Sequence, residues 1–153
     1  MPAIDVSRFI LTAIVAGIVG ALAMELTMWL ISKKGLARGS MIVAVGSLIT
    51  KTRQNAFRVG FLAHCLSAVV FAALYAFALM AVHATTLVPA ILLGGSIGFV
   101  HGMLVSLTLV WIVSDRHPLD EFRGADFAIG LSHFAGHVAF GGAVGFVVGL
   151  MSL

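Results

Sequence analysis

The sequence predicts an all-α membrane protein in which four transmembrane helices pack as a bundle. Hydrophobic residues make up 61% of the 153 residues and charged residues only 10%, and the mean hydropathy is +1.14. A soluble domain of this size has too little interior to bury so much apolar surface. Several apolar runs also exceed the roughly 18–20 residues that a transmembrane helix needs. The predicted spans, which form a single domain over residues 1–153, cover about residues 8–31, 57–82, 89–113 and 127–150.

The first span begins near Arg8 and ends near Ile31. The small residues at Ala21–Ala23 resemble a cleavage site, so a removed signal peptide is the alternative interpretation. However, the apolar run continues past that site through Trp29, which is longer than the hydrophobic region of a usual signal peptide. We therefore expect a retained helix.

The loop before the second span contains a short apolar stretch, Met41–Ile49, flanked by basic residues. It is too short to cross a bilayer, so we expect a half-buried turn or short helix in the membrane interface. Pro89 suits the first turn of the third span, because its fixed φ fits a helix start. The loop Ser114–Asp126 is the most charged segment and separates the last two spans.

The basic residues predict the orientation of the chain. Eight of the nine lie in or beside the first and third loops, namely Lys33, Lys34, Arg38, Lys51, Arg53, Arg58, Arg116 and Arg123. Only Arg8 lies on the other side. The positive-inside rule places these loops in the cytoplasm and both termini outside it. The basic residues therefore indicate orientation in a membrane, and we expect no nucleic-acid partner.

The two halves of the chain share a sequence pattern. Leu26–Ser32, at the end of the first span, resembles Leu107–Ser114, at the end of the third. The second and fourth spans align without a gap at Leu62, His64, Phe71 and Phe77 with Leu131, His133, Phe140 and Phe146. Both a duplicated hairpin and a chance match between apolar helices fit this pattern. Duplication would make His64 and His133 symmetry mates.

Each predicted span carries a row of small residues at four-residue spacing, which forms one face of a helix. Such rows allow close helix–helix contact in lipid. The glycines expected at helix contacts are Gly17, Gly60, Gly94, Gly98, Gly102, Gly141, Gly145 and Gly149. The ionisable residues on or beside the rows are Glu25, His64, His101, His133 and His137. We therefore expect these five side chains to face the interior of the bundle.

The five ionisable residues also fall at similar depths. At 1.5 Å per residue, Glu25, His64 and His133 lie roughly 8–9 Å to the cytoplasmic side of the midplane. His101 and His137 lie within about 3 Å of it, so the set forms one belt about 10 Å tall. An isolated charge near the bilayer centre costs roughly 2.5–3.5 kcal/mol, and Glu25 is therefore expected to be neutral, paired or a ligand.

Neutral imidazoles from several helices, with a carboxylate nearby, are typical ligands for Zn, Cu, Fe or Ni. His133 and His137 are four residues apart and can share one ion. Two histidines that face each other across a bundle also bind b-type haem axially, and His64 with His133 is the expected pair. The alternative is structural, with each histidine bonded to a backbone carbonyl or to Glu25. His117, in a loop, is expected to be solvated.

Three functions remain open. The first is a cofactor protein that holds a transition metal or haem for electron transfer or oxidation. The second is a small proton-coupled transporter or channel in a homo-oligomer, with Glu25 and the histidines as a relay. The third is an accessory subunit of a larger membrane complex. The sequence has no recognisable nucleophile–base pair or phosphate-binding loop, so enzymatic activity also remains open.

The layout of the chain resembles small uncharacterised bacterial four-helix inner-membrane proteins. The resemblance consists of a first span rich in small residues, a basic loop with a short apolar insert, a second span containing His64, and the His-x-x-Phe-Gly-Gly motif of His137–Gly142. It covers most of the chain. It implies a bacterial inner-membrane location and a four-helix topology, and it implies no activity.

Overall fold

The computed structural model describes residues 5–35, 40–124 and 127–151, and the elements within them are all helical. They are α1 (Val6–Lys33), α2 (Met41–Thr50), α3 (Ala56–Ala81), α4 (Leu87–Arg116), the 3-10 helix η1 (Asp120–Phe122) and α5 (Phe127–Met151). Four segments are long and apolar enough to cross a membrane, namely α1, α3, Leu87–Thr108 of α4, and α5. The predicted all-α class with four membrane spans is therefore confirmed, and a lipid bilayer is the environment that these helices suit. Arg38 and Asp126, two of the predicted loop charges, lie outside the described residues.

Local hydrogen bonds fix where the first helices begin. The Asp5 carboxylate accepts hydrogen bonds from the backbone N–H groups of Ser7 and Arg8, at 3.0 and 3.2 Å, and so caps α1. The Ser7 hydroxyl also donates to this carboxylate and, as the largest cause, lowers the Asp5 pKa. Ser40 caps α2 in the same way, accepting from the N–H of Val43.

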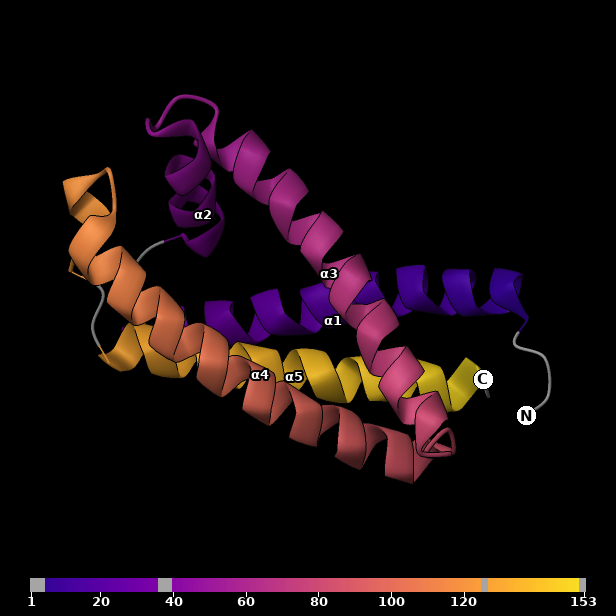
Figure 1. Ribbon diagram of the computed structural model, residues 1–153. Helices are drawn as coiled ribbons and strands as arrows, with labels where there is room; N and C mark the ends of the chain where they lie inside the picture. Colours follow the sequence, from indigo (N-terminus) through magenta and orange to yellow (C-terminus); the bar gives the residue numbers. More distant parts are fainter. Residues whose placement is uncertain (1–4, 36–39, 125–126, 152–153) are drawn as a thin grey trace.

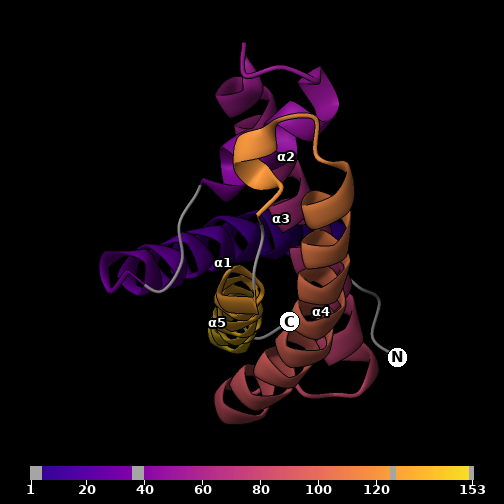
Figure 2. The ribbon, with the colours of Figure 1, turned by 90° about the vertical axis from the view of Figure 1, so that its left-hand side faces the viewer.

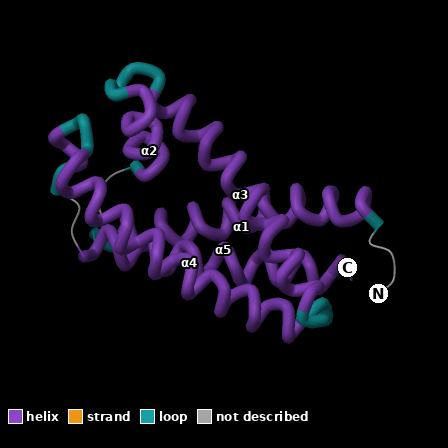
Figure 3. The backbone as a smooth tube through the Cα atoms, in the orientation of Figure 1, coloured by secondary structure: helices purple, strands orange, loops and turns teal. Residues whose placement is uncertain are grey.

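Helix α5 lies at the centre of the arrangement, packed against α4 on one side and α1 on another (Figures 1 and 2). Helix α3 packs against α1. Helices α3 and α4 are joined by a short turn and diverge from it, and α2 lies between their far ends (Figures 1 and 3). In a duplicated hairpin, α1 would correspond to α4 and α3 would correspond to α5. The close packing of α1 on α5 would then recur between α4 and α3. In the described part of the chain, α3 and α4 barely touch, so the helices do not show this symmetry.

Helices α4 and α5 meet through their backbones at the predicted glycine rows. A Cβ added at Gly141 would lie 2.2 Å from the carbonyl oxygen of Gly94, and one added at Gly145 would lie 2.0 Å from that of Ala90. These distances leave no room for a side chain. Close backbone contact of this kind replaces the hydrophobic effect as the force that holds helices together in lipid.

The short apolar stretch of the first loop forms α2, which packs tightly on α3. A Cβ added at Gly46 would lie 1.8 Å from the carbonyl oxygen of Ala56, and one added at Gly60 would lie 1.8 Å from that of Ile42. The expected short helix is thus present. Its contact surface is supplied by another helix of the same chain.

The loop after α4 is attached to α2 by His117. This side chain is completely buried, so the prediction that it is solvated is wrong. Its Nδ1 accepts from the N–H of Leu119 at 3.1 Å, and its Nε2–H group faces the carbonyl oxygen of Ala44 at 3.1 Å and the hydroxyl of Ser47 at 3.3 Å. The contact with α2 is what removes His117 from solvent.

The two ends of the bundle differ in charge. At the end where α1 begins and α5 ends, the Arg8 guanidinium donates to the carbonyl oxygen of Met151. The other described basic residues lie at the opposite end or in its loops, namely Lys33, Lys34, Lys51, Arg53, Arg58, Arg116 and Arg123. The ion pair between Arg53 and Glu121 joins two of those loops across the surface.

Candidate functional site

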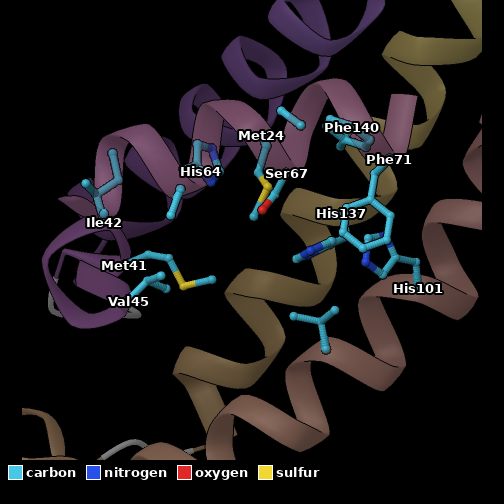
Figure 4. Close-up of a pocket in the computed structure, with 14 residues that line it drawn as sticks. Met24, Met41, Ile42, Val45, His64, Ser67, Phe71, His101, His137 and Phe140 are labelled. Atoms are coloured by element: carbon cyan, nitrogen blue, oxygen red, sulfur yellow. The ribbon is translucent and has the colours of Figure 1, made fainter. Parts of the chain in front are cut away.

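A cavity of about 240 Å³ lies between the diverging helices, and all five α-helices contribute to its wall (Figure 4). Three of the predicted site residues line it: His64 from α3, His101 from α4 and His137 from α5. Most of the remaining lining is apolar. The fold therefore brings three imidazoles from separate membrane-spanning helices to one space, as the rows of small residues predict.

His137 is held in a defined tautomer by its own helix. Its Nδ1–H group donates to the carbonyl oxygen of His133 at 2.7 Å. A neutral imidazole with a hydrogen on Nδ1 has its lone pair on Nε2. Since His137 lines the cavity and is 7% exposed, this nitrogen is a candidate acceptor or ligand in a largely dry environment.

His64 faces the only acidic side chain that lies within a predicted span. Its Nε2 is 3.5 Å from Oε1 of Glu25, which is an ion-pair distance and slightly long for a hydrogen bond. Both atoms are buried and make no hydrogen bond with any described residue. The Glu25 side chain as a whole is 43% exposed, however, so the carboxyl group sits at the edge of the bundle.

His101 is positioned by aromatic neighbours. Its Nδ1 shares a 2.9 Å hydrogen bond with the hydroxyl group of Tyr75, and the Phe71 ring lies 4.3 Å from its ring, centroid to centroid. The His101 ring also meets the His137 ring edge-on, at 4.7 Å. Tyr75 is 4% exposed and was not among the predicted site residues. The sequence offers one indication of its role at the site, because Tyr75 is the only tyrosine of the chain and lies inside an apolar span.

His133 precedes His137 by one turn of α5, and its backbone carbonyl accepts the hydrogen bond from His137. Its side chain is buried and its Nδ1 has no hydrogen-bond partner among the described residues. It is not among the described residues that line the cavity. The structure therefore does not bring the His133 ring to the space shared by His64 and His137, which were its two expected partners. Over the described ranges, no group of three His, Cys, Asp or Glu side chains is arranged to hold a metal ion.

Comparison with protein-family models, with curated proteins and with solved structures finds no match to this chain. The residues around the cavity are therefore the basis for assigning a function.

Proposed function

We propose that this protein binds a transition-metal ion between its membrane-spanning helices and uses it for electron transfer or oxidation. The observation that carries the proposal is that His64 and His137 line one cavity from two different helices (Figure 4). An imidazole is the commonest metal-binding side chain for Zn, Cu and Fe in proteins. His101 lines the same cavity and supports the His137 ring through an edge-on contact.

The partners of the two imidazoles support this proposal. Metal-binding histidines almost always donate their second ring N–H to a backbone carbonyl or a carboxylate, which fixes the tautomer and the ring orientation. His137 has such a partner in the carbonyl of His133. His64 has one within reach in the carboxylate of Glu25. In each case the other ring nitrogen then carries the lone pair that a metal requires.

A b-type haem, the other predicted cofactor, is less well supported. Pockets for drug-sized ligands occupy about 300–1,000 Å³, and a porphyrin is at least as large as such a ligand. The cavity measures about 240 Å³ and has His64, but not His133, in its described lining. Axial binding by that pair would require the helices to separate.

The proposal includes a location in the bacterial inner membrane with both termini outside the cytoplasm, because the basic residues gather at one end of the bundle. It also includes assembly with a second copy or with other membrane proteins. Glu25 supports the assembly, since its side chain is 43% exposed on a membrane-spanning helix. Although Oε1 is buried against His64, the exposed part of a polar side chain is costly in hydrocarbon, and a protein neighbour would cover it.

Proton-coupled transport is the second candidate function, and two groups of polar side chains beside one cavity favour it. Glu25 faces His64, while His137, His101 and Tyr75 follow one another through ring contacts and a hydrogen bond. Intramembrane Glu and His residues are the usual components of proton relays. Proteoliposomes loaded with a pH-sensitive dye test this function. Glu25→Gln and His137→Ala are expected to abolish any proton flux that the wild-type protein supports.

Metal content tests the main proposal. The purified full-length protein is stripped with a chelator, titrated separately with Zn²⁺, Co²⁺, Fe²⁺ and Cu⁺ in detergent, and analysed for bound metal and visible absorbance. We expect stoichiometric binding of at least one metal by the wild type and its loss in His64→Ala and His137→Ala. His83→Asn, at an exposed turn residue outside the cavity lining, is the matched control and is expected to bind normally. A folded wild type that binds none of these metals would contradict the proposal.

A further inference from the structure

Two methionine side chains share the cavity with the imidazoles. Met24 projects from α1 and Met41 from α2, and Figure 4 shows both sulfur-bearing ends directed into the space that His64 and His137 also line. Met24 is 3% exposed and lies against α5, since a Cβ added at Gly136 would be 3.0 Å from its Cγ. Met24 thus packs against α5 at the position that directly precedes His137, and both residues line the cavity.

The donor set of the cavity is soft. Thioether sulfur atoms favour monovalent copper, whereas zinc sites are built from thiolates, imidazoles and carboxylates, and calcium and magnesium sites from oxygen. We infer that the cavity is a copper(I) site whose ligands are two imidazoles and two thioethers, from His64, His137, Met24 and Met41. This inference rests on the proposed metal-binding function and specifies the metal.

The charge of the site also fits a monovalent ion. The cost of moving an ion out of water grows with the square of its charge, so a divalent ion is far more costly in an apolar wall than a monovalent one. Imidazole and thioether ligands are neutral and leave the charge of the ion uncompensated. The Glu25 carboxyl group, whose Oε1 lies 3.5 Å from Nε2 of His64, would in its ionised form supply one negative charge, which would balance copper(I) and leave a divalent ion unbalanced.

Methionine also fills irregular gaps in cores, and this structural role must be separated from ligation. Substitution by leucine keeps the apolar volume and removes the sulfur, so it preserves packing while removing the ligand. Met103, on α4, is 44% exposed and lies outside the cavity lining, and Met103→Leu therefore serves as the matched control.

Competition with a copper(I)-specific chromogenic chelator, under anaerobic reducing conditions, tests the inference. The full-length protein in detergent is compared as wild type, Met24→Leu, Met41→Leu, the double variant and Met103→Leu. We expect each cavity substitution to weaken copper(I) binding by at least about 10-fold, the smallest loss typical of removing even a hydrogen-bond partner of a metal ligand, and the control to leave it unchanged. X-ray absorption of the copper-loaded wild type is expected to show sulfur neighbours that the double variant lacks.

The possible results separate the two proposals. In one outcome, copper binding depends on His64 and His137, the wild type and the double variant bind copper equally, and X-ray absorption shows only nitrogen and oxygen neighbours. This outcome overturns the copper(I)–thioether site and leaves the metal proposal intact. Binding of Fe²⁺ or Co²⁺ without measurable copper(I) affinity does the same. A wild type that binds none of the metals overturns both. Circular dichroism and gel filtration establish that each variant is folded.

Discussion

Nε2 of His117 lies 3.1 Å from the carbonyl oxygen of Ala44, and this contact attaches the loop after α4 to the short helix α2. His117→Ala is expected to lower the free energy of unfolding by about 1–3 kcal/mol, because the variant loses a completely buried imidazole together with its hydrogen bond to α2. Thermal unfolding in detergent, followed by circular dichroism, measures the change. His83→Asn alters an exposed histidine whose φ of 56° asparagine tolerates, and it should have almost no effect. Equal stability of the His117 and His83 variants would contradict the proposed attachment.

The contact between α4 and α5 predicts opposite behaviour for two neighbouring glycines. Gly141→Ala is expected to destabilise the protein by about 1–3 kcal/mol, because the new methyl group would overlap the Gly94 backbone. Gly142→Ala is the matched control, since a Cβ there would meet nothing within 4 Å. It should keep or raise the stability, as alanine favours helix more than glycine does. The unfolding midpoints of the two variants, measured in the same detergent, test this prediction. A similar loss of stability in both variants would argue against the contact.

Removing the Tyr75 hydroxyl group tests the support of His101. Tyr75→Phe keeps the edge-on contact with Phe140, whose ring centroid lies 5.7 Å away. It removes only the 2.9 Å hydrogen bond to His101. We expect a loss of about 1 kcal/mol in unfolding free energy, typical of one hydrogen bond. Phe71→Leu removes the aromatic ring that lies beside His101, and its effect on stability would measure the contribution of ring packing separately from that of the hydrogen bond. No loss in Tyr75→Phe would mean that the two groups do not interact.

The start of α1 should respond to acid. The hydrogen bond from the Ser7 hydroxyl, followed by that from the Arg8 N–H, lowers the Asp5 pKa below its ordinary value of 3.8. Because the folded pKa is the lower one, the cap contributes its full stabilisation above pH 3.8 and loses it as the pH falls through the folded value. Amide hydrogen exchange of Ser7 and Arg8 should therefore quicken only at strongly acidic pH.

Asp5→Asn provides the control for the acid response. Asparagine is a good N-cap residue without a titrating carboxylate. Amide hydrogen exchange in the first turn of this variant should therefore show no acid-induced increase beyond the intrinsic pH dependence of amide exchange. The same acid response in wild type and variant would mean that another group is responsible.

The long helices follow directly from composition and length. A span predicted at 57–82 is the helix Ala56–Ala81, because an uninterrupted apolar run has few other ways to satisfy its backbone in lipid. The inward position of His64, His101 and His137 follows from helical periodicity for the same local reason. Burial of His117 could not be predicted, since its position in a loop says nothing about which helix the loop contacts.

The set of side chains that share the cavity could not be predicted from periodicity alone. His133 and His137 lie on one face of α5, yet only His137 lines the cavity. The difference depends on where α3 and α4 diverge, and a four-residue repeat does not determine a crossing angle. The positions of Met24 and Met41 in the cavity lining were not predicted because neither carries an ionisable group. The short helix at Met41–Ile49 was expected, but its place in the cavity wall was not, because a ten-residue helix has no fixed position in a membrane protein.

Helix α2 belongs to the cavity wall and is also attached, through the carbonyl oxygen of Ala44, to His117 at the end of α4. One wall of the cavity is therefore anchored to the polar segment that follows α4, and not to the membrane-spanning helices alone.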